Sequence, residues 1–352
     1  MSADSEVVLS PEAATDLARS ILVAAGTPED KAQLVAASLV ASNLRGIDSH
    51  GLQLLPFYLR HIECGNINPR AEGHIVREDG ATLLYDGEQG LGAVISAVCC
   101  DHASRLAAAH GAGLVVARNS THFGMAATWA LRMSAAGNIG IVMCNASPIV
   151  PPWQGKEPRL GTNPICMSVP GDPAKTWLLD MATTTVAAGK IFKAYINKQP
   201  SIPPGWALDS EGRPTTETKA AYHGLIMPLG GYKGSGLAVM VEILCGVLSG
   251  GATSMEVGGI RLTDRPFGTS QMFLAIDVGR FLPREEFEAR MDSLVEVVKS
   301  AAVAAGYAEI LVAGDPERRM EARRHIEGIP IAPGTWQDLC AAQNRLPKNP
   351  GR

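Results

Sequence analysis

The segment GIDSHG, residues 46–51, places a histidine between two apolar helical stretches. The imidazole of His50 titrates near neutral pH, which suits a general acid or base. Ser49 and His50 are adjacent, so their side chains do not face each other on a strand or helix, and no GxSxG segment indicates a serine nucleophile. Either Asp48 or Ser49 orients His50, or Asp48 caps a helix and His50 lies at the surface. Spacing alone favours the second interpretation.

A second histidine, His122, lies in NSTHFGMAATWA, residues 119–130. The pattern predicts that a strand ends at about Arg118 and that a helix begins near Gly124. Ligands of α/β proteins usually bind where strands end, and the free N–H groups of a helix amino terminus attract anions such as pyrophosphate. His122 therefore either contributes to such a site or only packs against the start of the helix.

Three further segments carry groups that could bind a ligand. In PLGGYKGSGLAVMVEIL, residues 228–244, glycines surround Lys233 just before a predicted helix, so the lysine could meet a phosphate or carboxylate, or lie solvated in a flexible turn. In LLDMATTTVAAGK, residues 178–190, Asp180 follows an apolar strand and could accept a hydrogen bond from a sugar hydroxyl or cap a helix. RLGTNP, residues 159–164, offers backbone and hydroxyl donors in a tight turn.

The usual nucleotide and metal motifs are missing from the sequence. GLGAVI at 90–95 and GSGLAV at 234–239 lack the third glycine and the strand context of a Rossmann fingerprint, and no P-loop occurs. No HxxxH, HExxH or acidic calcium loop is present, and the eight histidines are scattered. The sequence therefore predicts no metal site, and any nucleotide must bind in another way.

Apolar periodicity and capping residues predict the elements that position these segments. Ser10 and Pro11 begin a helix that Gly26 closes, and a segment capped by Asp48 runs to about Gly65, with a kink or a late start at Pro56. The other predicted helices cover 29–45, 94–111, 126–137, 235–249 and 284–305. The predicted strands cover 80–87, 112–120, 139–147 and 271–277, region 150–232 is rich in loops, and the tail is irregular. This alternation indicates an α/β lobe.

Composition excludes several function classes. The 352 residues suggest two compact lobes, and a net charge of −4 without a basic run argues against a nucleic-acid partner. No apolar run approaches the roughly 20 residues that span a bilayer, and the amino terminus shows no signal-peptide pattern. Seven cysteines, without a CxxC pair, are typical of reduced and mostly buried thiols in a cytoplasmic protein.

Taken together, these segments resemble the malate/L-lactate dehydrogenase family, whose members use NAD(P) without a Rossmann fold. GIDSHG, THFGMA, GTNP, LLDMAT, IPPGWALDSEGRPTT, LGGYKGSGLAVMVEIL and LSGG occur in family order over roughly residues 10–330, and the tail GIPIAPGTWQDLC is similar to the hydroxycarboxylate dehydrogenase branch. The resemblance implies a non-Rossmann α/β fold with a helical N-terminal region and a central cofactor-binding lobe.

The resemblance also implies three regions. Residues 1–75 would form the helical part of a substrate and dimerisation domain, and residues 76–281 an NAD(P)-binding α/β region with a loop-rich insert. Residues 282–352 would pack back on the N-terminal domain. Family members form homodimers with sites near the subunit interface, so we expect a homodimer.

Residue roles carry over from the family by position. His50 is implied as the proton donor and acceptor, with Ser49 as its orienting or relay partner and Lys190 as a further catalytic position. Thr162 and Leu54 fall on substrate contacts. Cofactor contacts fall on His122, Phe123, Gly124, Met125, Ala126, Asp180, Met181, Ala182, Lys233 and Asp315. His122 serves as the acid/base in some members.

The implied reaction moves a hydride between NAD or NADP and a small 2-hydroxy or 2-oxo acid, similar to malate or lactate. A cyclic ketimine reductase is the alternative, and a binding protein that has lost catalysis is disfavoured by the intact Ser49 and His50. Leu54 stands where many members carry a carboxylate-binding arginine, which leaves the substrate open. Lys190 stands where ketimine reductases carry an aspartate, and a cation there would repel an iminium substrate.

Overall fold

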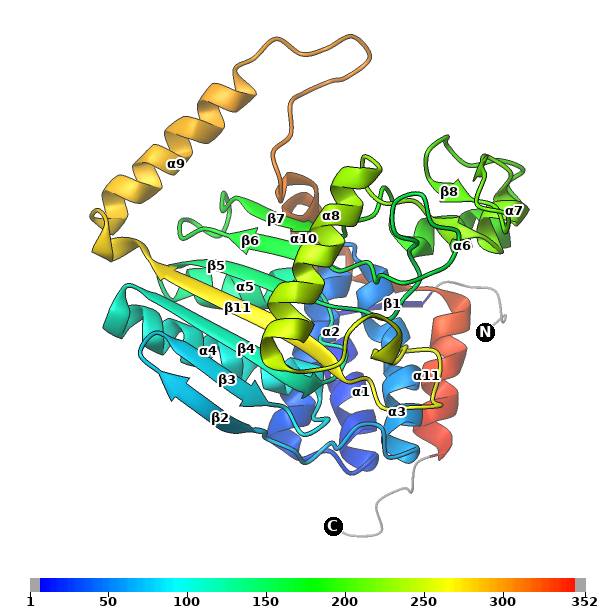
Figure 1. Cartoon of the computed structure of the whole chain (residues 1–352), viewed down its shortest axis with the longest axis horizontal. Coiled ribbons are helices and arrows are strands. Elements are labelled where there is room, and N and C mark those ends of the chain that lie inside the picture. The colour runs from blue at the N-terminus through cyan, green and yellow to red at the C-terminus, as the bar shows by residue number, and fades with distance from the viewer. Residues whose placement is uncertain (1–6, 346–352) are drawn as a thin grey trace.

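A seven-stranded sheet crosses the protein in the order β2–β3–β4–β11–β5–β6–β7 (Figure 1). Its strands are β2 (His74–Asp79), β3 (Thr82–Asp86), β4 (Ala112–Ser120), β5 (Asn138–Cys144), β6 (Ile165–Ser168), β7 (Leu178–Met181) and β11 (Thr269–Asp277). β3 and β4 pair in parallel, and the other neighbours pair antiparallel. The computed structural model describes residues 7–345, so the ends of the first and last predicted regions, 1–6 and 346–352, lie outside the described residues.

Helices cover both faces of this sheet. On one face lie α4 (Gly92–His110) and α5 (Ala126–Ala135), which are covered in turn by α1 (Pro11–Ala24), α2 (Glu29–Leu44) and α3 (Leu55–Glu63). On the other face lies α8 (Tyr232–Glu242), which continues as a π-helical turn over Ile243–Val247. The expected α/β fold with a helical N-terminal region is therefore confirmed.

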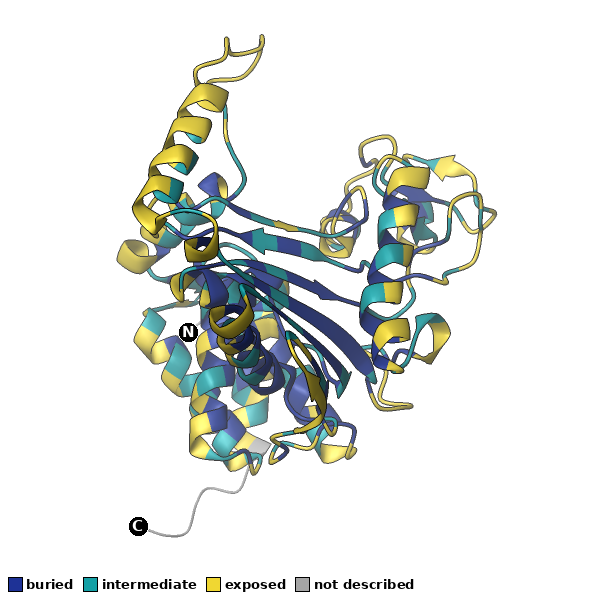
Figure 2. Ribbon diagram, turned by 60° about the vertical axis from the view of Figure 1, so that its left-hand side comes forward, coloured by how far each residue is buried: buried dark blue, intermediate teal, exposed yellow. Residues whose placement is uncertain are grey.

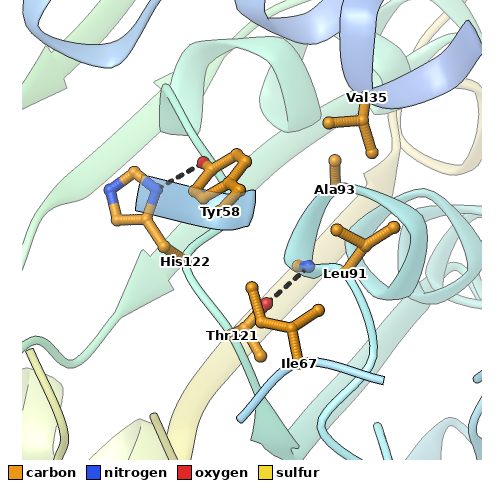
Figure 3. A pocket seen from close by; sticks show the side chains of 8 residues that line it. Val35, Tyr58, Ile67, Leu91, Ala93, Thr121 and His122 are labelled. Atoms are coloured by element: carbon orange, nitrogen blue, oxygen red, sulfur yellow. Dashed lines mark hydrogen bonds between the residues drawn. The ribbon is translucent and has the colours of Figure 1, made fainter. Parts of the chain in front are cut away.

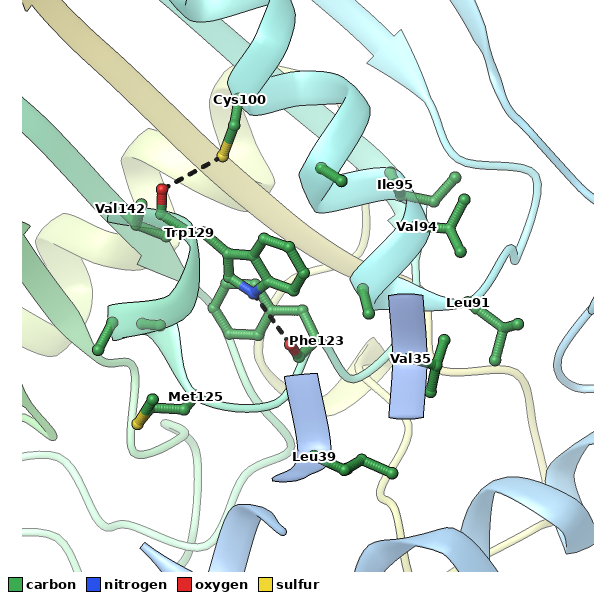
Figure 4. Packing of buried hydrophobic residues seen from close by; sticks show 14 of the residues in the cluster. Val35, Leu39, Leu91, Val94, Ile95, Cys100, Phe123, Met125, Trp129 and Val142 are labelled. Atoms are coloured by element: carbon green, nitrogen blue, oxygen red, sulfur yellow. Dashed lines mark hydrogen bonds between the residues drawn. The ribbon is translucent and has the colours of Figure 1, made fainter. Parts of the chain in front are cut away.

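The largest core lies between the sheet and the N-terminal helices (Figure 4). The indole of Trp129 on α5 is 1% exposed, and its Nε1 donates to the carbonyl of Phe123 at 2.9 Å. Val35 and Leu39, on α2, belong to the same cluster. This packing holds the start of α5, where the His122 segment lies, against the N-terminal helices.

Local signals explain several element boundaries. The Ser10 hydroxyl accepts from the Ala13 N–H at 3.1 Å, so Ser10 and Pro11 start α1 as predicted. Gly111, with a φ of 89°, ends α4 in the left-handed conformation that glycine adopts without strain. Pro56 lies in the first turn of α3, so the late start is confirmed over the kink.

The carboxyl-terminal region departs from the prediction of an irregular tail, which was wrong. It contains α10 (Asp315–Glu327), β12 (Ile329–Ile331) and α11 (Pro333–Arg345). The sequence of α10, DPERRMEARRHIE, has almost no apolar stripe, and ion pairs such as Arg45–Glu321 hold it to the residue that follows α2. The predicted helix 284–305 is shorter than expected, since α9 (Arg284–Lys299) ends at Lys299.

The first described strand pairs with the last one. β12 pairs antiparallel with β1 (Val7–Leu9), and α11 packs on α3. The carboxyl-terminal elements therefore lie against the N-terminal helices, while the division of the chain into three domains stays a prediction. α9 stands away from the body with none of its residues buried (Figure 2).

The loop-rich region contains a small lobe with its own core. This lobe holds α6 (Ala188–Ile196), α7 (Thr218–Tyr222) and a sheet of β8 (Ala207–Leu208), β9 (Pro214–Thr215) and β10 (Leu225–Ile226). A backbone hydrogen bond from Thr185 N to the Met227 carbonyl, at 2.9 Å, ties its two ends together. In Figure 1 it lies to the right of α8.

Among residues 7–345, no helix combines the length and the apolar character that a membrane crossing requires. All seven cysteines are free, and five of them are buried, as expected for structural thiols.

Candidate active site

The GIDSHG segment forms two short 3-10 turns, Asp48–His50 and Leu52–Leu54, before α3 begins. Asp48 caps no helix, which corrects that prediction. Its carboxylate instead accepts from Arg324 on α10, at 2.7 and 3.1 Å, and from the Asn43 Nδ2 at 2.6 Å. Asn43 Oδ1 accepts from the Leu52 N–H at 2.9 Å. The segment is therefore anchored from both sides, which fixes where it presents its side chains.

Only glycine fits at position 51, because Asn43 packs against its backbone. A Cβ at this position would lie 2.2 Å from Asn43 Oδ1, closer than any real contact. The DSHG pattern thus combines an aspartate that holds the turn, two side chains that it presents, and a glycine that makes room for Asn43.

Ser49 and His50 do meet, although they are adjacent. In the 3-10 turn the Ser49 hydroxyl lies 3.0 Å from Nδ1 of His50. Of the two interpretations of the segment, this geometry favours the one in which Ser49 orients the imidazole. Burial of the ring lowers the pKa of His50 below its usual value, because the charged form is desolvated.

His122 lies beside His50, between the end of β4 and the start of α5. The two imidazoles stack with ring centroids 5.6 Å apart and planes inclined by 28°. Nδ1 of His122 lies 2.8 Å from the hydroxyl of Tyr58, as Figure 3 shows, and 3.2 Å from the N–H of Gly124. Burial, and to a smaller extent the neighbouring His50, lower the pKa of His122 to about 3. His122 is therefore neutral at neutral pH.

Asp180, on β7, reaches the amino end of α5. Its Oδ2 accepts from the Ala127 N–H at 2.9 Å, so the predicted anion site at this helix start holds a carboxylate of the protein itself. Although the residue is exposed, its pKa is raised to about 6: desolvation of the carboxyl by surrounding protein atoms raises it most, the hydrogen bond from the Ala127 N–H lowers it, and nearby Glu317 raises it to a smaller extent. Oδ1 has no hydrogen-bond partner within the described residues.

Backbone hydrogen bonds join the other three predicted segments. Thr183 N donates to the Thr162 carbonyl at 2.9 Å, and Leu229 N donates to the Thr183 carbonyl at 2.9 Å. Gly234 N in turn donates to the Leu229 carbonyl at 2.7 Å. GTNP, DMATTT and GGYKG, distant in sequence, therefore converge at one place.

The remaining predicted residues are placed in different ways. Lys233 is exposed in the first turn of α8, rather than before it. Lys190 is exposed in the first turn of α6, and the preceding Gly189 borders Ser49, since a Cβ added there would lie 3.9 Å from the Ser49 Cβ. Three more predicted positions, namely Thr162, Met181 and Ala182, are half-buried.

Some predicted contact residues are turned into the protein. Leu54 is 7% exposed and packs in the main core. The THFGMA side chains of Phe123, Met125 and Ala126 are buried as well, whereas the Cβ position of Gly124 faces open space.

Asp315 is also buried, and its charge is matched inside the protein. It pairs with Lys299 at 2.7 Å and with Arg318, and it accepts from Val312 N at 3.0 Å. A hydrogen bond from Leu178 N to the Ala313 carbonyl places the start of α10 beside β7, the strand that carries Asp180.

Sequence reasoning missed four residues of this site: Asn43, Tyr58, Glu317 and Arg324. Tyr58 had one usable signal, because a tyrosine on the buried face of a helix needs a partner for its hydroxyl. The other three have no local signal. Within residues 7–345, no group of three or more histidine, cysteine, aspartate or glutamate side chains is placed to bind a metal.

Comparisons with known proteins identify the family of the chain. A family model described as malate/L-lactate dehydrogenase matches residues 9–340. The chain is 36% identical to L-sulfolactate dehydrogenase of Methanocaldococcus jannaschii, over 97% of this chain and 98% of the relative. The solved structure of the M. jannaschii sulfolactate dehydrogenase matches with a TM-score of 0.91, over 97% of both chains.

Two other proteins extend the comparison. Malate dehydrogenase of Pyrococcus horikoshii is 37% identical, over 93% of this chain and 92% of the relative. The structure of Δ1-piperideine-2-carboxylate reductase from Pseudomonas syringae pv. tomato matches with a TM-score of 0.84 at 26% identity, over 96% of this chain and 99% of that one.

Proposed function

The chain belongs to the malate/L-lactate dehydrogenase family, and from this premise we propose that it is an NAD- or NADP-dependent 2-hydroxy acid dehydrogenase. The observation that carries the proposal is the pair of stacked imidazoles, of which His50 is held by Ser49 and His122 is neutral. The pair offers one group that can transfer a proton and one that can donate a hydrogen bond.

The proposed reaction divides between cofactor and protein. A bound NAD or NADP would supply the hydride acceptor for the hydroxyl-bearing carbon of the substrate. The hydroxyl proton passes to Nε2 of His50, and the C–O bond becomes a carbonyl. Ser49 accepts from Nδ1–H of His50, which leaves the Nε2 lone pair free to act as the base. In the reverse direction, His50 returns the proton to the 2-oxo acid.

The residues present fit a nicotinamide dinucleotide. Lys233 offers an exposed positive charge for phosphate, and Oδ1 of Asp180 can accept from a sugar hydroxyl. The open space at Gly124 allows close approach to the backbone beside His122. These groups support a site for NAD or NADP between α5, β7 and α8.

We propose that the substrate carries a second anionic group. The relatives named above act on malate and sulfolactate, whose second acidic groups are a carboxylate and a sulfonate. In this chain the start of α6 borders Ser49, and the exposed Lys190 follows Gly189 in the same turn, so its ammonium is the candidate partner of this second group. The hydroxyl of Thr162 is a further candidate contact. Leu54 is apolar and buried, so it cannot bind a carboxylate.

The direct test mixes the purified protein with NADH or NADPH and three 2-oxo acids: oxaloacetate, sulfopyruvate and pyruvate. We expect cofactor oxidation, fastest with one of the dianionic substrates. The variant Lys190→Gln is expected to raise KM for the dianion about tenfold, the effect of one charge-assisted hydrogen bond, and to change KM for pyruvate less. No oxidation with any 2-oxo acid contradicts the proposal. Much faster turnover of piperideine-2-carboxylate supports the ketimine reductase instead.

We also propose that the protein is a homodimer. α9 has no buried residue, and it exposes Leu294, Val297 and Val298. Isolated helices of this length are marginal in water, so a partner surface would stabilise it. Light scattering on the eluted protein is expected to give twice the chain mass. The double variant Leu294→Asp/Val297→Asp is expected to shift the protein toward monomer, and a monomeric wild-type protein refutes the proposal.

A further inference from the structure

The hydrogen bonds at His122 determine which of its ring nitrogens carries the proton. The backbone N–H of Gly124 points at Nδ1 over 3.2 Å. A backbone amide can only donate, so Nδ1 must present its lone pair, and the proton of the neutral ring lies on Nε2. This assignment follows from geometry alone.

The hydroxyl of Tyr58 reinforces this tautomer. It lies 2.8 Å from the same Nδ1, and because that nitrogen is an acceptor, the hydroxyl is the donor. The tyrosine is 4% exposed, and within residues 7–345 its hydroxyl has no other hydrogen-bond partner. The Tyr58 hydroxyl therefore donates its hydrogen bond to His122.

Apolar side chains surround the Tyr58 side of this hydrogen bond. A recess behind His122 is lined by Tyr58 and mainly by apolar residues such as Val35, Ile67 and Leu91, and it leaves no room for a water molecule (Figure 3). A hydrogen bond in a dry, apolar setting holds its geometry better than one that competes with solvent. The other ring nitrogen, Nε2, lies on the side of the ring away from Tyr58.

We infer that Tyr58 is a positioning residue: with the Gly124 N–H it holds His122 as a neutral imidazole that presents Nε2–H, and it thereby leaves the proton transfer to His50. A ring fixed in this way can donate to a carbonyl or carboxylate oxygen of the substrate, but it has no free lone pair with which to take a proton. His50, stacked beside it, has its Nδ1 on Ser49 and its own Nε2 available.

The donor role of His122 toward substrate rests on the proposed function, whereas its tautomer does not. The test therefore starts with a readout that needs no turnover. Protein labelled with ¹⁵N in its histidine rings is examined by NMR, and the His122 signals are identified by their loss in His122→Gln. We expect a wild-type spectrum in which Nε2 is protonated and Nδ1 is not, near neutral pH. A protonated Nδ1 overturns the inference.

The variant Tyr58→Phe removes only the hydroxyl. We expect the His122 signals to move toward a mixture of tautomers, and kcat with the best 2-oxo acid to fall by up to about tenfold while KM changes little, because the loss corresponds to one hydrogen bond. Unchanged His122 signals in this variant refute the role of Tyr58. Turnover absent in the wild type, with the expected spectrum, refutes the proposed function and leaves the tautomer assignment intact.

Tyr85 provides the matched control. It is also 4% exposed, and its hydroxyl donates to the Glu72 carbonyl at 2.6 Å, within a different part of the fold. Tyr85→Phe deletes a buried hydroxyl at similar cost to stability, and it is expected to leave the His122 signals and kcat unchanged. Equal losses of kcat in both variants indicate general destabilisation, and they contradict the inference.

Discussion

The guanidinium of Arg324 holds both carboxylate oxygens of Asp48, at 2.7 and 3.1 Å, although 276 positions separate the two residues. Arg324 is 7% exposed and lies in the last turn of α10, so a carboxyl-terminal helix fixes the turn that presents Ser49 and His50.

Replacing this arginine is expected to loosen the turn. Arg324→Met keeps an unbranched, shorter side chain and removes the hydrogen bonds to Asp48 and to the Asn43 carbonyl, so we expect a loss of about 1–3 kcal/mol in the free energy of unfolding and a reduced kcat. Urea denaturation and steady-state kinetics measure the two effects. Arg290→Met, which breaks an exposed i, i+4 ion pair on α9, is the control and is expected to cost less than about 0.5 kcal/mol. Equal effects of the two substitutions contradict the anchoring role.

A substitution of Gly51 tests how closely Asn43 packs against the same turn. A methyl group in Gly51→Ala would collide with Asn43 Oδ1, so we expect destabilisation of about 1–3 kcal/mol, together with a displaced His50 and lower turnover. Gly334→Ala, in the first turn of α11, adds the same methyl group into open space and is expected to be neutral or slightly stabilising. A Gly51→Ala protein as stable and active as Gly334→Ala would show that the turn tolerates the collision.

The two histidines are expected to differ in their effect on pH dependence. His50→Gln should lower kcat by about 10²–10⁴, the usual contribution of a general acid or base. Because burial lowers the pKa of His50 below 6.5, the proposed reduction, which needs the protonated ring, should accelerate as pH falls below 6.5, and oxidation should slow there. His122→Gln should retain this pH profile at lower kcat. A profile that disappears in His122→Gln instead assigns the proton transfer to His122.

Asp180 gives a prediction on stability. Its pKa is raised to about 6 from an ordinary value of 3.8, so the folded state binds more protons than the unfolded state between these values. The stability contributed by Asp180 must therefore fall as pH rises from about 4 to about 6, and stay constant above that. Asp180→Asn keeps an oxygen for the Ala127 N–H and removes the titration. Thermal unfolding of both proteins is measured at pH 4, 5, 6 and 7. The stability of Asp180→Asn relative to the wild type should increase as pH rises from 4 to 6, and a decrease over this range refutes the assignment.

Features that depend on neighbouring residues are predictable from the sequence. Ser10 and Pro11 start α1 through a local cap, and Gly111 ends α4 because only glycine adopts its backbone conformation without strain. The alternation of β3, α4, β4, α5 and β5 follows from hydrophobic periodicity. These elements position His122 at the end of β4, as the sequence predicts.

Features that depend on distant residues are not predictable in this way. Asp48 resembles an N-cap, because the sequence does not reveal that Arg324 lies opposite it. The sequence of α10 resembles an irregular tail, because the helix has no apolar face. Its residues instead form ion pairs with Arg45, at the end of α2, and with Asp48 in the GIDSHG turn. The contact between Tyr58 and His122 joins positions 64 residues apart, and only the packing of α3 brings them together. The candidate site is thus visible from the sequence as separate segments, and its hydrogen-bond network is visible only in the fold.

The position of β11 also has a consequence for synthesis of the protein. This strand, Thr269–Asp277, lies between β4 and β5, which are made far earlier, and β1 pairs with a strand made later still. While the ribosome is still extending the chain, β4 and β5 therefore lack the strand that joins them, and their unpaired edges and apolar faces stay open to other chains. The central sheet cannot be completed before β11 is made, so chaperones that shield the nascent polypeptide until residue 277 has emerged should raise its yield.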